Sequence, residues 1–162
     1  MDDLESAFRD AMARVAAPVT VITTDDGTRP SGTTVSAFAS LSVTPPMVMF
    51  ALDNRGGMIE RLRETGRAGV NILAGDQAHL AIKFAGKHLA ERFAGVDWEP
   101  DHGLPRLAGI AAWVRSDDLT FLPGGDHTIV TATVASAEAT GLSSLGYHLR
   151  EFRDNRPAPL MP

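Results

Sequence analysis

The sequence predicts a mainly β fold, an antiparallel Greek-key-type barrel with peripheral helices. Short runs of apolar and β-branched residues recur along the chain and are separated by turn residues. In Gly32–Phe50, small hydroxyl residues alternate with apolar residues, which is typical of a strand with one buried face. The strands do not alternate regularly with long helices, which argues against a doubly wound parallel sheet.

The chain begins with a predicted amphipathic helix. Asp2 or Asp3 can cap this helix, and Pro18 ends it, because proline cannot continue a helix. Apolar residues at helical spacing form a stripe along one face. The stripe consists of Leu4, Phe8, Met12 and Val15.

Strands joined by turns come next. A strand at Val19–Thr23 leads through an Asp-Asp-Gly turn into a return strand that starts near Ser31. Four hydroxyl residues of that return strand share one parity: Thr34, Ser36, Ser40 and Ser42. One continuous strand is therefore expected to display them on one face. Pro45 and Pro46 stop this strand, and Met47–Leu52 follows as a buried strand.

The rest of the chain divides into short elements. The expected helices are Met58–Glu64, ended by a left-handed Gly66, and Asp76–Phe84. The expected strands are Ala68–Leu73, Ile110–Val114, Leu119–Leu122 and, after a Gly124-Gly125 turn, Thr128–Glu138. The expected connections are a loop at Asn54–Gly57, a polar segment at His88–Asp101, and a strand turn or short helix within Gly141–Arg156. Residues 1–156 are expected to form one domain, and 157–162 a frayed tail.

Composition limits the class of protein. The formal net charge of −5 argues against nucleic acid or an anionic membrane as a partner. The chain has no cysteine, so it has no disulfides, thiol catalysis or thiolate metal site. The acidic N-terminus is unlike a secretory signal, and no apolar run approaches the ~20 residues that span a bilayer. A cytoplasmic protein is expected.

Several common catalytic motifs are missing. The sequence holds no G-x-G-x-x-G after a strand, no complete Walker A loop and no G-x-S-x-G elbow. Its five histidines show no short metal-ligand spacing, so no metal site is expected.

Five segments, in this order and spacing, resemble the short-chain flavin reductase family of NAD(P)H:flavin oxidoreductases. They are Gly32-Thr-Thr-Val-Ser-Ala-Phe-Ala-Ser-Leu-Ser-Val-Thr-Pro-Pro, Ala68-Gly-Val-Asn-Ile-Leu, Lys83-Phe-Ala-Gly, Arg92-Phe-Ala-Gly and Gly125-Asp-His-Thr-Ile-Val. The resemblance covers roughly Phe8 to Arg153. It implies an FMN-binding split β-barrel that works as a homodimer, uses FMN or FAD with NADH or NADPH, and supplies reduced flavin to a separate monooxygenase. The scarcity of acid–base groups suits hydride transfer between two cofactors, which needs no general base from the protein.

The resemblance places the flavin ring on the hydroxyl strand. The residues expected at the ring edge are Thr33, Thr34, Val35, Ser36 and Ala37, through backbone N–H groups and the hydroxyls of Thr34 and Ser36. Ala37 stands where the family often has a second serine, so only a backbone contact survives there. Ser40 and Ser42 are expected at the ribityl chain or the phosphate. From the pattern alone, an edge strand with solvated hydroxyls explains the same residues.

A second set is expected at the flavin phosphate, where amides at a helix N-terminus bind anions. It consists of Asp53, Asn54, Arg55, Gly56, Gly57 and Met58, with a charged contact from Arg55. An ordinary loop that enters a helix is the alternative. Phe84 is expected to wall the flavin site or, alternatively, to lie in the core.

The remaining candidates concern the hydride donor. The resemblance implies that His127 positions the nicotinamide, through a hydrogen bond or ring packing, whereas a plain turn histidine is the alternative. Tyr147 and Arg150 fall in the family's second nicotinamide-contacting segment. Two other functions stay open: a flavin-binding electron carrier or sensor without turnover, and a barrel enzyme that reduces a corrinoid or a quinone.

Overall fold

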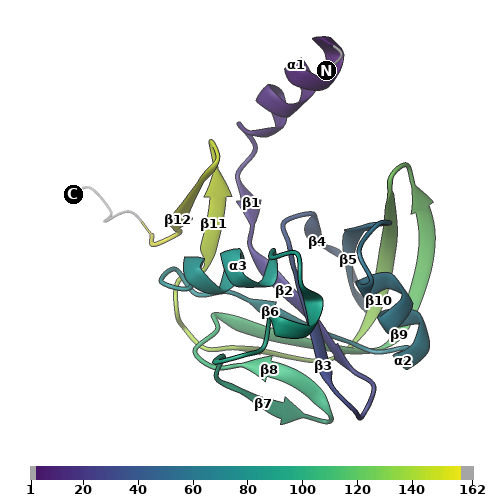
Figure 1. Cartoon of the computed structure of the whole chain (residues 1–162). Coiled ribbons are helices and arrows are strands. Elements are labelled where there is room, and N and C mark those ends of the chain that lie inside the picture. The colour runs from purple at the N-terminus through teal and green to yellow at the C-terminus, as the bar shows by residue number, and fades with distance from the viewer. Residues whose placement is uncertain (1–2, 158–162) are drawn as a thin grey trace.

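The computed structural model describes residues 3–157 (Figure 1). The helices are α1 (Asp3–Met12), α2 (Met58–Thr65), α3 (Ala78–Phe84) and the short 3-10 helix η1 (Leu89–Glu91). No helix in this described range is both long and apolar enough to cross a membrane. Of the tail predicted to fray, Pro157 has no regular structure and residues 158–162 lie outside the described range.

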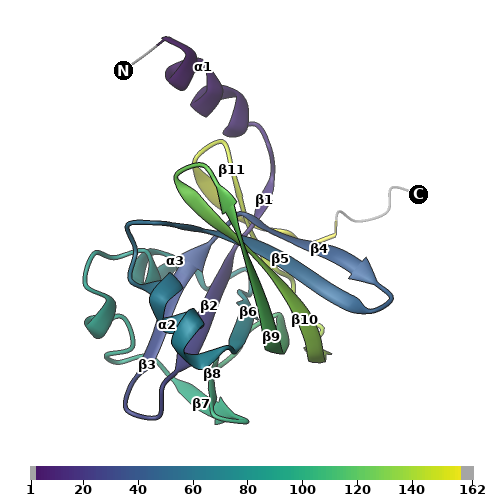
Figure 2. The same ribbon diagram turned by 90° about the vertical axis from the view of Figure 1, so that its right-hand side faces the viewer.

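A seven-stranded antiparallel sheet forms the body. Its strands are β2 (Thr20–Asp25), β3 (Pro30–Val35), β4 (Phe38–Val43), β5 (Pro46–Asp53), β6 (Ala68–Ile72), β9 (Ala112–Gly124) and β10 (His127–Ala139). Their spatial order is β3-β2-β6-β9-β10-β5-β4. Only Ser36 and Ala37 separate β3 at one edge from β4 at the other, so the two edges must converge there. The sheet therefore curls into a barrel that is split elsewhere, which confirms the predicted fold class (Figure 2).

Two smaller sheets flank the barrel. β1 (Ala17–Pro18), β11 (Leu145–His148) and β12 (Glu151–Asp154) form one, in the order β1-β11-β12. β7 (Trp98–Asp101) and β8 (Leu104–Leu107) form a hairpin.

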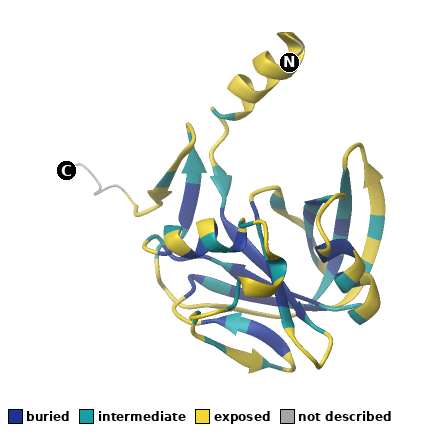
Figure 3. Cartoon of the chain, in the orientation of Figure 1, coloured by how far each residue is buried: buried dark blue, intermediate teal, exposed yellow. Residues whose placement is uncertain are grey.

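Two hydrophobic clusters form on opposite faces of the sheet. Figure 3 shows buried residues along the central strands, whereas helix α1 is exposed. The consecutive residues Val21 and Ile22 show the division, because neighbouring residues of a strand point to opposite faces. Ile22 joins the cluster that includes three residues of α2, whereas Val21 joins the cluster that holds α3, β8 and β11 on the sheet. Burial of an isoleucine or valine side chain contributes about 1.5–3 kcal/mol.

The Ala68–Leu73 segment has a structural role. Its buried Asn71 donates through Nδ2 to the Val21 carbonyl (3.1 Å) and accepts at Oδ1 from the Leu107 N–H (2.7 Å), which ties β8 to the sheet. Gly69 is required because a Cβ there would lie 2.3 Å from the Trp113 ring. Asn71 thus holds the hairpin on the sheet, and Gly69 leaves room for the Trp113 ring of the neighbouring strand β9.

Helix α1 stands apart from the body (Figures 1 and 2). None of its residues is buried, and its predicted apolar stripe is exposed, from 78% at Leu4 to 47% at Met12. The β11–β12 turn contacts the residues that follow this helix, where the Leu149 N–H donates to the Ala13 carbonyl at 2.7 Å.

The structure corrects four predicted elements. Helix α1 ends at Met12 rather than at Pro18, which lies in strand β1, and the cap candidate Asp2 lies outside the described residues. The hydroxyl strand is not continuous: it breaks at Ser36 and Ala37, and a bulge between Ser40 and Ser42 shifts the register again. The two short strands predicted at Ile110–Val114 and Leu119–Leu122 are one long bulged strand, β9. The polar segment His88–Asp101 contains η1 and strand β7.

Candidate functional site

The junction between β3 and β4 exposes backbone groups. Arg92 donates through Nη1 to the Gly32 carbonyl at 2.8 Å, so Gly32 directs its peptide groups away from β2, the neighbour of this edge strand. Peptide groups of alternate residues point the same way in an antiparallel strand. Thr34 therefore directs its N–H and C=O outward as well, whereas Thr33 and Val35 face β2 across the ladder.

Ser36 and Ala37 form the connection that follows this edge. Both are exposed and belong to no strand, and within residues 3–157 their N–H groups donate to no backbone carbonyl. The Ala37 carbonyl accepts from the Ala51 N–H at 3.0 Å, which fixes the junction against β5. Two N–H groups without a backbone acceptor, on exposed residues, fit the carbonyl and ring-nitrogen acceptors at the edge of a flavin.

A cavity of about 380 Å³ lies beside this junction and brings four predicted residues together. They are Thr34, Ser36, Tyr147 and Arg150. The Thr34 hydroxyl donates its proton to the Ala81 carbonyl at 2.7 Å, so its oxygen can only accept a hydrogen bond from a ligand. The Tyr147 ring packs against Phe152, with centroids 5.0 Å apart, and α3 supplies an apolar wall.

A second group of predicted residues gathers where β5 and β10 meet. His127 lies opposite Asp53 in the strand register. Asn54 accepts from the Thr128 hydroxyl at 2.7 Å, and its own N–H donates to the Asp126 carbonyl at 3.0 Å. These bonds hold the Asp53–Met58 loop against the β9–β10 turn.

The charges of this second group are paired. Arg55 grips the Asp53 carboxylate through Nε (3.0 Å) and Nη2 (2.6 Å), and these hydrogen bonds hold the pKa of Asp53 well below its usual range. The His127 ring lies 2.7 Å from an Asp126 carboxylate oxygen through Nδ1, and this contact lowers the pKa of Asp126. Arg55 therefore meets a ligand phosphate only in competition with Asp53.

Strand β5 links the two groups. Ala51 holds the junction at Ala37, and Asp53 follows two residues later, about 7 Å along the strand. His127, with a side chain 41% exposed, lies on the next strand opposite Asp53. The exposed amides and the histidine thus share one end of the barrel surface.

Other predicted residues lie elsewhere. Ser40 and Ser42 follow β4 away from the junction, and neither lines a cavity that contains Ser36. Phe84 is fully buried and packs edge-on against Phe93, with centroids 4.9 Å apart, so its expected role as a flavin wall is corrected to a core role. Val35 and Met58 also bury their side chains in the core and offer a ligand only backbone groups.

Sequence reasoning missed two supporting residues. Arg92, whose pKa is lowered by burial, also donates through Nε to the Gly86 carbonyl at 3.0 Å and so braces β3 from outside. Its position in the Arg92-Phe-Ala-Gly segment was the available signal. Asp126 lies in the Gly125-Asp-His-Thr-Ile-Val segment, and that position was the available signal for it as well.

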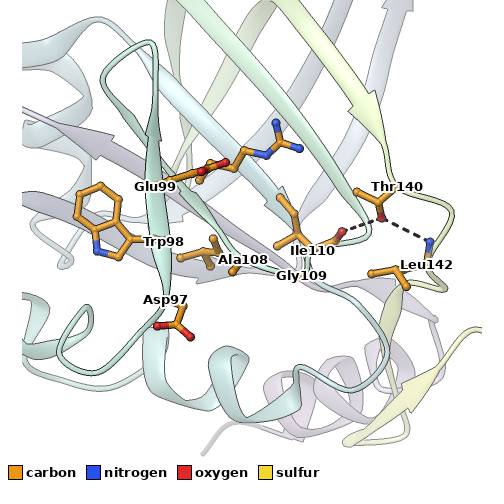
Figure 4. Close-up of a pocket in the computed structure, with 10 residues that line it drawn as sticks. Asp97, Trp98, Glu99, Ala108, Gly109, Ile110, Thr140 and Leu142 are labelled. Atoms are coloured by element: carbon orange, nitrogen blue, oxygen red, sulfur yellow. Dashed lines mark hydrogen bonds between the residues drawn. The ribbon is translucent and has the colours of Figure 1, made fainter.

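A cavity of about 630 Å³ lies away from both groups (Figure 4). Residues of β7 line it together with the Arg106–Ile110 segment, Thr140 and Leu142. The Thr140 hydroxyl donates to the Ile110 carbonyl at 2.8 Å, and Arg106 is held by Glu138 at 2.9 Å. None of the predicted site residues lines this cavity, whereas four of them line the cavity beside the β3–β4 junction, which makes that junction the candidate site.

The fold and the junction define a split-barrel protein whose exposed amides fit the edge of a flat heterocycle. Comparison with known proteins agrees, because the flavin reductase like domain matches residues 12–156. The chain belongs to this flavin reductase family.

Individual relatives span most of the chain. An NADH:FMN oxidoreductase from Rhodococcus qingshengii is 36% identical over 160 residues, which cover 94% of this chain and 82% of the relative. The reductase component of a 4-nitrophenol 4-monooxygenase/4-nitrocatechol 2-monooxygenase from Rhodococcus opacus is 35% identical over 148 residues, 91% of this chain and 80% of the relative. Two Rhizobium meliloti relatives are longer, and the chain spans 46% and 62% of their length.

A solved structure extends the comparison. The Streptomyces globisporus NADH:FAD oxidoreductase SgcE6, in complex with NAD and FAD fragments, superposes with a TM-score of 0.89. It is 28% identical, and the match covers 100% of this chain and 98% of the other.

Proposed function

We propose that this chain is an NAD(P)H-dependent flavin reductase that reduces FMN or FAD and passes the reduced flavin to a separate monooxygenase. The observation that carries the proposal is the pair of exposed backbone donors at Ser36 and Ala37, fixed beside the Tyr147 cavity and on the same barrel end as His127. The relatives named as NADH:FMN oxidoreductase and as a monooxygenase reductase component support it.

The chain's residues bind and orient two cofactors. With both bound, a hydride passes from the reduced nicotinamide to the flavin, a step in which the reacting atoms belong to the cofactors. The amides of Ser36 and Ala37 hold the acceptor edge of the flavin ring, and the Tyr147 cavity takes the ring of the nicotinamide nucleotide. Such alignment, with donor and acceptor about 3–3.5 Å apart, lowers the barrier by several kcal/mol.

His127 positions the hydride donor in this proposal. Because the Asp126 carboxylate can only accept, the proton of a neutral His127 lies on Nδ1. Nε2 is then left to accept from the nicotinamide carboxamide. Tyr147 and Arg150 face the same nucleotide.

The Asp53–Met58 loop takes the flavin phosphate in this proposal. Its support is the start of α2, where no side chain caps the helix at Gly57, so that backbone N–H groups stay available to an anion. Because Arg55 is paired with Asp53, the loop binds the phosphate less tightly, which suits a flavin that must dissociate.

The proposal includes a homodimer and a cytoplasmic location. Edge strand β4 supports the dimer, because its Leu41 and Val43 are 47% and 87% exposed and its outer backbone groups have no neighbouring strand among residues 3–157. A reductase of this kind needs the reduced nicotinamide nucleotides of the cytoplasm.

A steady-state assay tests the activity. The purified chain is mixed with FMN or FAD and with NADH or NADPH, and absorbance at the nicotinamide band is followed. Oxidation of the nucleotide that depends on added flavin supports a reductase. Bound yellow flavin without nucleotide oxidation instead identifies a flavin-binding carrier or sensor, and turnover only with a corrinoid or a quinone identifies a different acceptor.

A further inference from the structure

A third cavity, of about 570 Å³, lies between α1 and the β11–β12 turn. Its lining includes two guanidinium groups, two aromatic rings, a serine hydroxyl shared with the site described above, and a carboxylate. These belong to Arg9, Arg150, Phe8, Tyr147, Ser36 and Asp10. The volume lies in the range of cavities that take small organic ligands.

This cavity continues into the site already described. Ser36, Tyr147 and Arg150 line both this cavity and the smaller one beside the β3–β4 junction. A ligand with two ends can therefore place one end in each, with Tyr147 and Arg150 between them. FMN lacks a second heterocycle, whereas a dinucleotide has one.

The turn that presents Arg150 has an unusual backbone. Leu149 and Arg150 both adopt left-handed conformations, with φ of 53° and 64°. Two-residue turns of this kind favour Asn-Gly or Gly-Gly, because a Cβ disfavours the left-handed region. Position 150 thus holds a large cationic side chain although glycine would adopt this backbone conformation with the least strain. Unfavourable backbone conformations of this kind cluster at ligand sites.

Arg150 is held by a competing anion. Its guanidinium pairs with the Asp10 carboxylate of α1, and both side chains are more than half exposed. An exposed ion pair is weak, so a stronger anion can replace the carboxylate. A pyrophosphate offers two charges that match two arginine side chains, since guanidinium groups bind phosphate through paired hydrogen bonds.

We propose that this cavity is a subsite for the adenosine diphosphate moiety that FAD and NADH share. Arg150 and Arg9 bind the pyrophosphate, Phe8 and Tyr147 flank the adenine, and α1 forms a wall of the dinucleotide site. Asp10 occupies Arg150 until the ligand arrives. The inference rests on the proposed function and adds residues that distinguish dinucleotides from FMN.

Calorimetry with ADP as the probe tests the subsite. Arg150→Gly is expected to weaken ADP binding about 10- to 100-fold, the loss typical of a hydrogen bond to a charged group. Its melting temperature is expected to stay equal or rise, because glycine removes the left-handed strain. Asp10→Asn is expected to tighten ADP binding, since the competing anion is gone. The matched control is Arg153→Gln, an exposed arginine of the same hairpin that pairs with Glu151, and its ADP affinity is expected to equal that of the wild type.

Three results overturn the subsite: no ADP binding by the wild type, an unchanged affinity in Arg150→Gly, or weaker binding in Asp10→Asn. Two arms identify the source of the moiety. If FAD supplies it, Arg150→Gly raises the Kd for FAD and leaves that for FMN unchanged; if NADH supplies it, the KM for NADH rises with FMN as acceptor. Flavin-dependent NADH oxidation, measured for the wild type and Arg153→Gln, tests the proposed function separately from the subsite. Without that turnover the proposed function fails, whereas turnover with unaffected ADP binding in Arg150→Gly rejects only the subsite.

Discussion

The guanidinium of Arg92 donates to the carbonyl of Gly32 at 2.8 Å, across sixty positions of sequence. This bond orients the free edge of β3 and so the outward-facing peptide groups of Thr34, two residues before Ser36. The same side chain also binds the Gly86 carbonyl. A residue outside the candidate site therefore sets the direction of its backbone donors.

Replacement of Arg92 by methionine is expected to lower the free energy of unfolding by about 1–3 kcal/mol, because the carbonyls of Gly32 and Gly86 lose a charged donor. Flavin affinity is expected to fall as well, since the edge of β3 is no longer braced. Urea unfolding and flavin fluorescence titration measure the two effects. The exposed neighbour Lys87→Met is the control, and equal behaviour of both variants contradicts the bracing role.

His127→Ala is expected to raise the KM for the nicotinamide nucleotide roughly tenfold, the effect of one lost hydrogen bond of about 1.4 kcal/mol. The Kd for flavin is expected to stay nearly unchanged. Asp126→Asn is expected to change the KM in the same direction, because the amide no longer fixes the proton on Nδ1. Loss of flavin binding in His127→Ala would contradict the assignment of this histidine to the nicotinamide subsite.

Acid is expected to weaken the fold through Asp53. Hydrogen bonds from Arg55 hold the pKa of this carboxyl below its ordinary value of 3.8. A group whose pKa is lower in the folded state stabilises the fold above its unfolded pKa, and that contribution is lost as the pH falls through the folded pKa. The free energy of unfolding, measured with urea from pH 6 downward, is therefore expected to fall below about pH 5.

Asp53→Asn is expected to flatten that dependence, and added salt is expected to reduce it in the wild type because the pair is exposed. An identical slope in the variant and the wild type assigns the acid sensitivity to other carboxylates.

The proposed homodimer is expected to depend on edge strand β4. Val43→Asp places a charge at a side chain that is 87% exposed in the single chain and is expected to shift the protein from dimer to monomer in analytical ultracentrifugation. Leu142→Asp, at another exposed apolar residue, is the control and is expected to leave the dimer intact. A monomeric wild type, or a Val43→Asp variant that stays dimeric, contradicts this interface.

Elements with local signals could be predicted from the sequence. The helix that begins at Met58 ends at Thr65, and the next residue, Gly66, has the left-handed φ of 66° expected of a glycine past a helix end. The Gly124-Gly125 turn joins β9 to β10 as expected. The barrel class followed from such turns and alternating strands.

Features that depend on distant contacts could not be predicted. The break at Ser36 follows from closure of the sheet, because β3 and β4 pair with different neighbours, and the alternating pattern continues across the break. The role of Arg150 depends on α1, far away in sequence. The family resemblance predicted the Ser36 region and His127 as site residues. The strand register that relates them depends on pairing between strands that are distant in sequence.

The central claim is that the amides of Ser36 and Ala37 hold the flavin edge. Titration of the nitrogen-15-labelled chain with FMN, followed through its amide resonances, tests this most directly. We expect the Ser36 and Ala37 signals to move farthest, with smaller shifts at Thr34 and His127. Shifts confined to Ala108 and Gly109, beside the cavity of Figure 4, would place the flavin elsewhere and contradict the account.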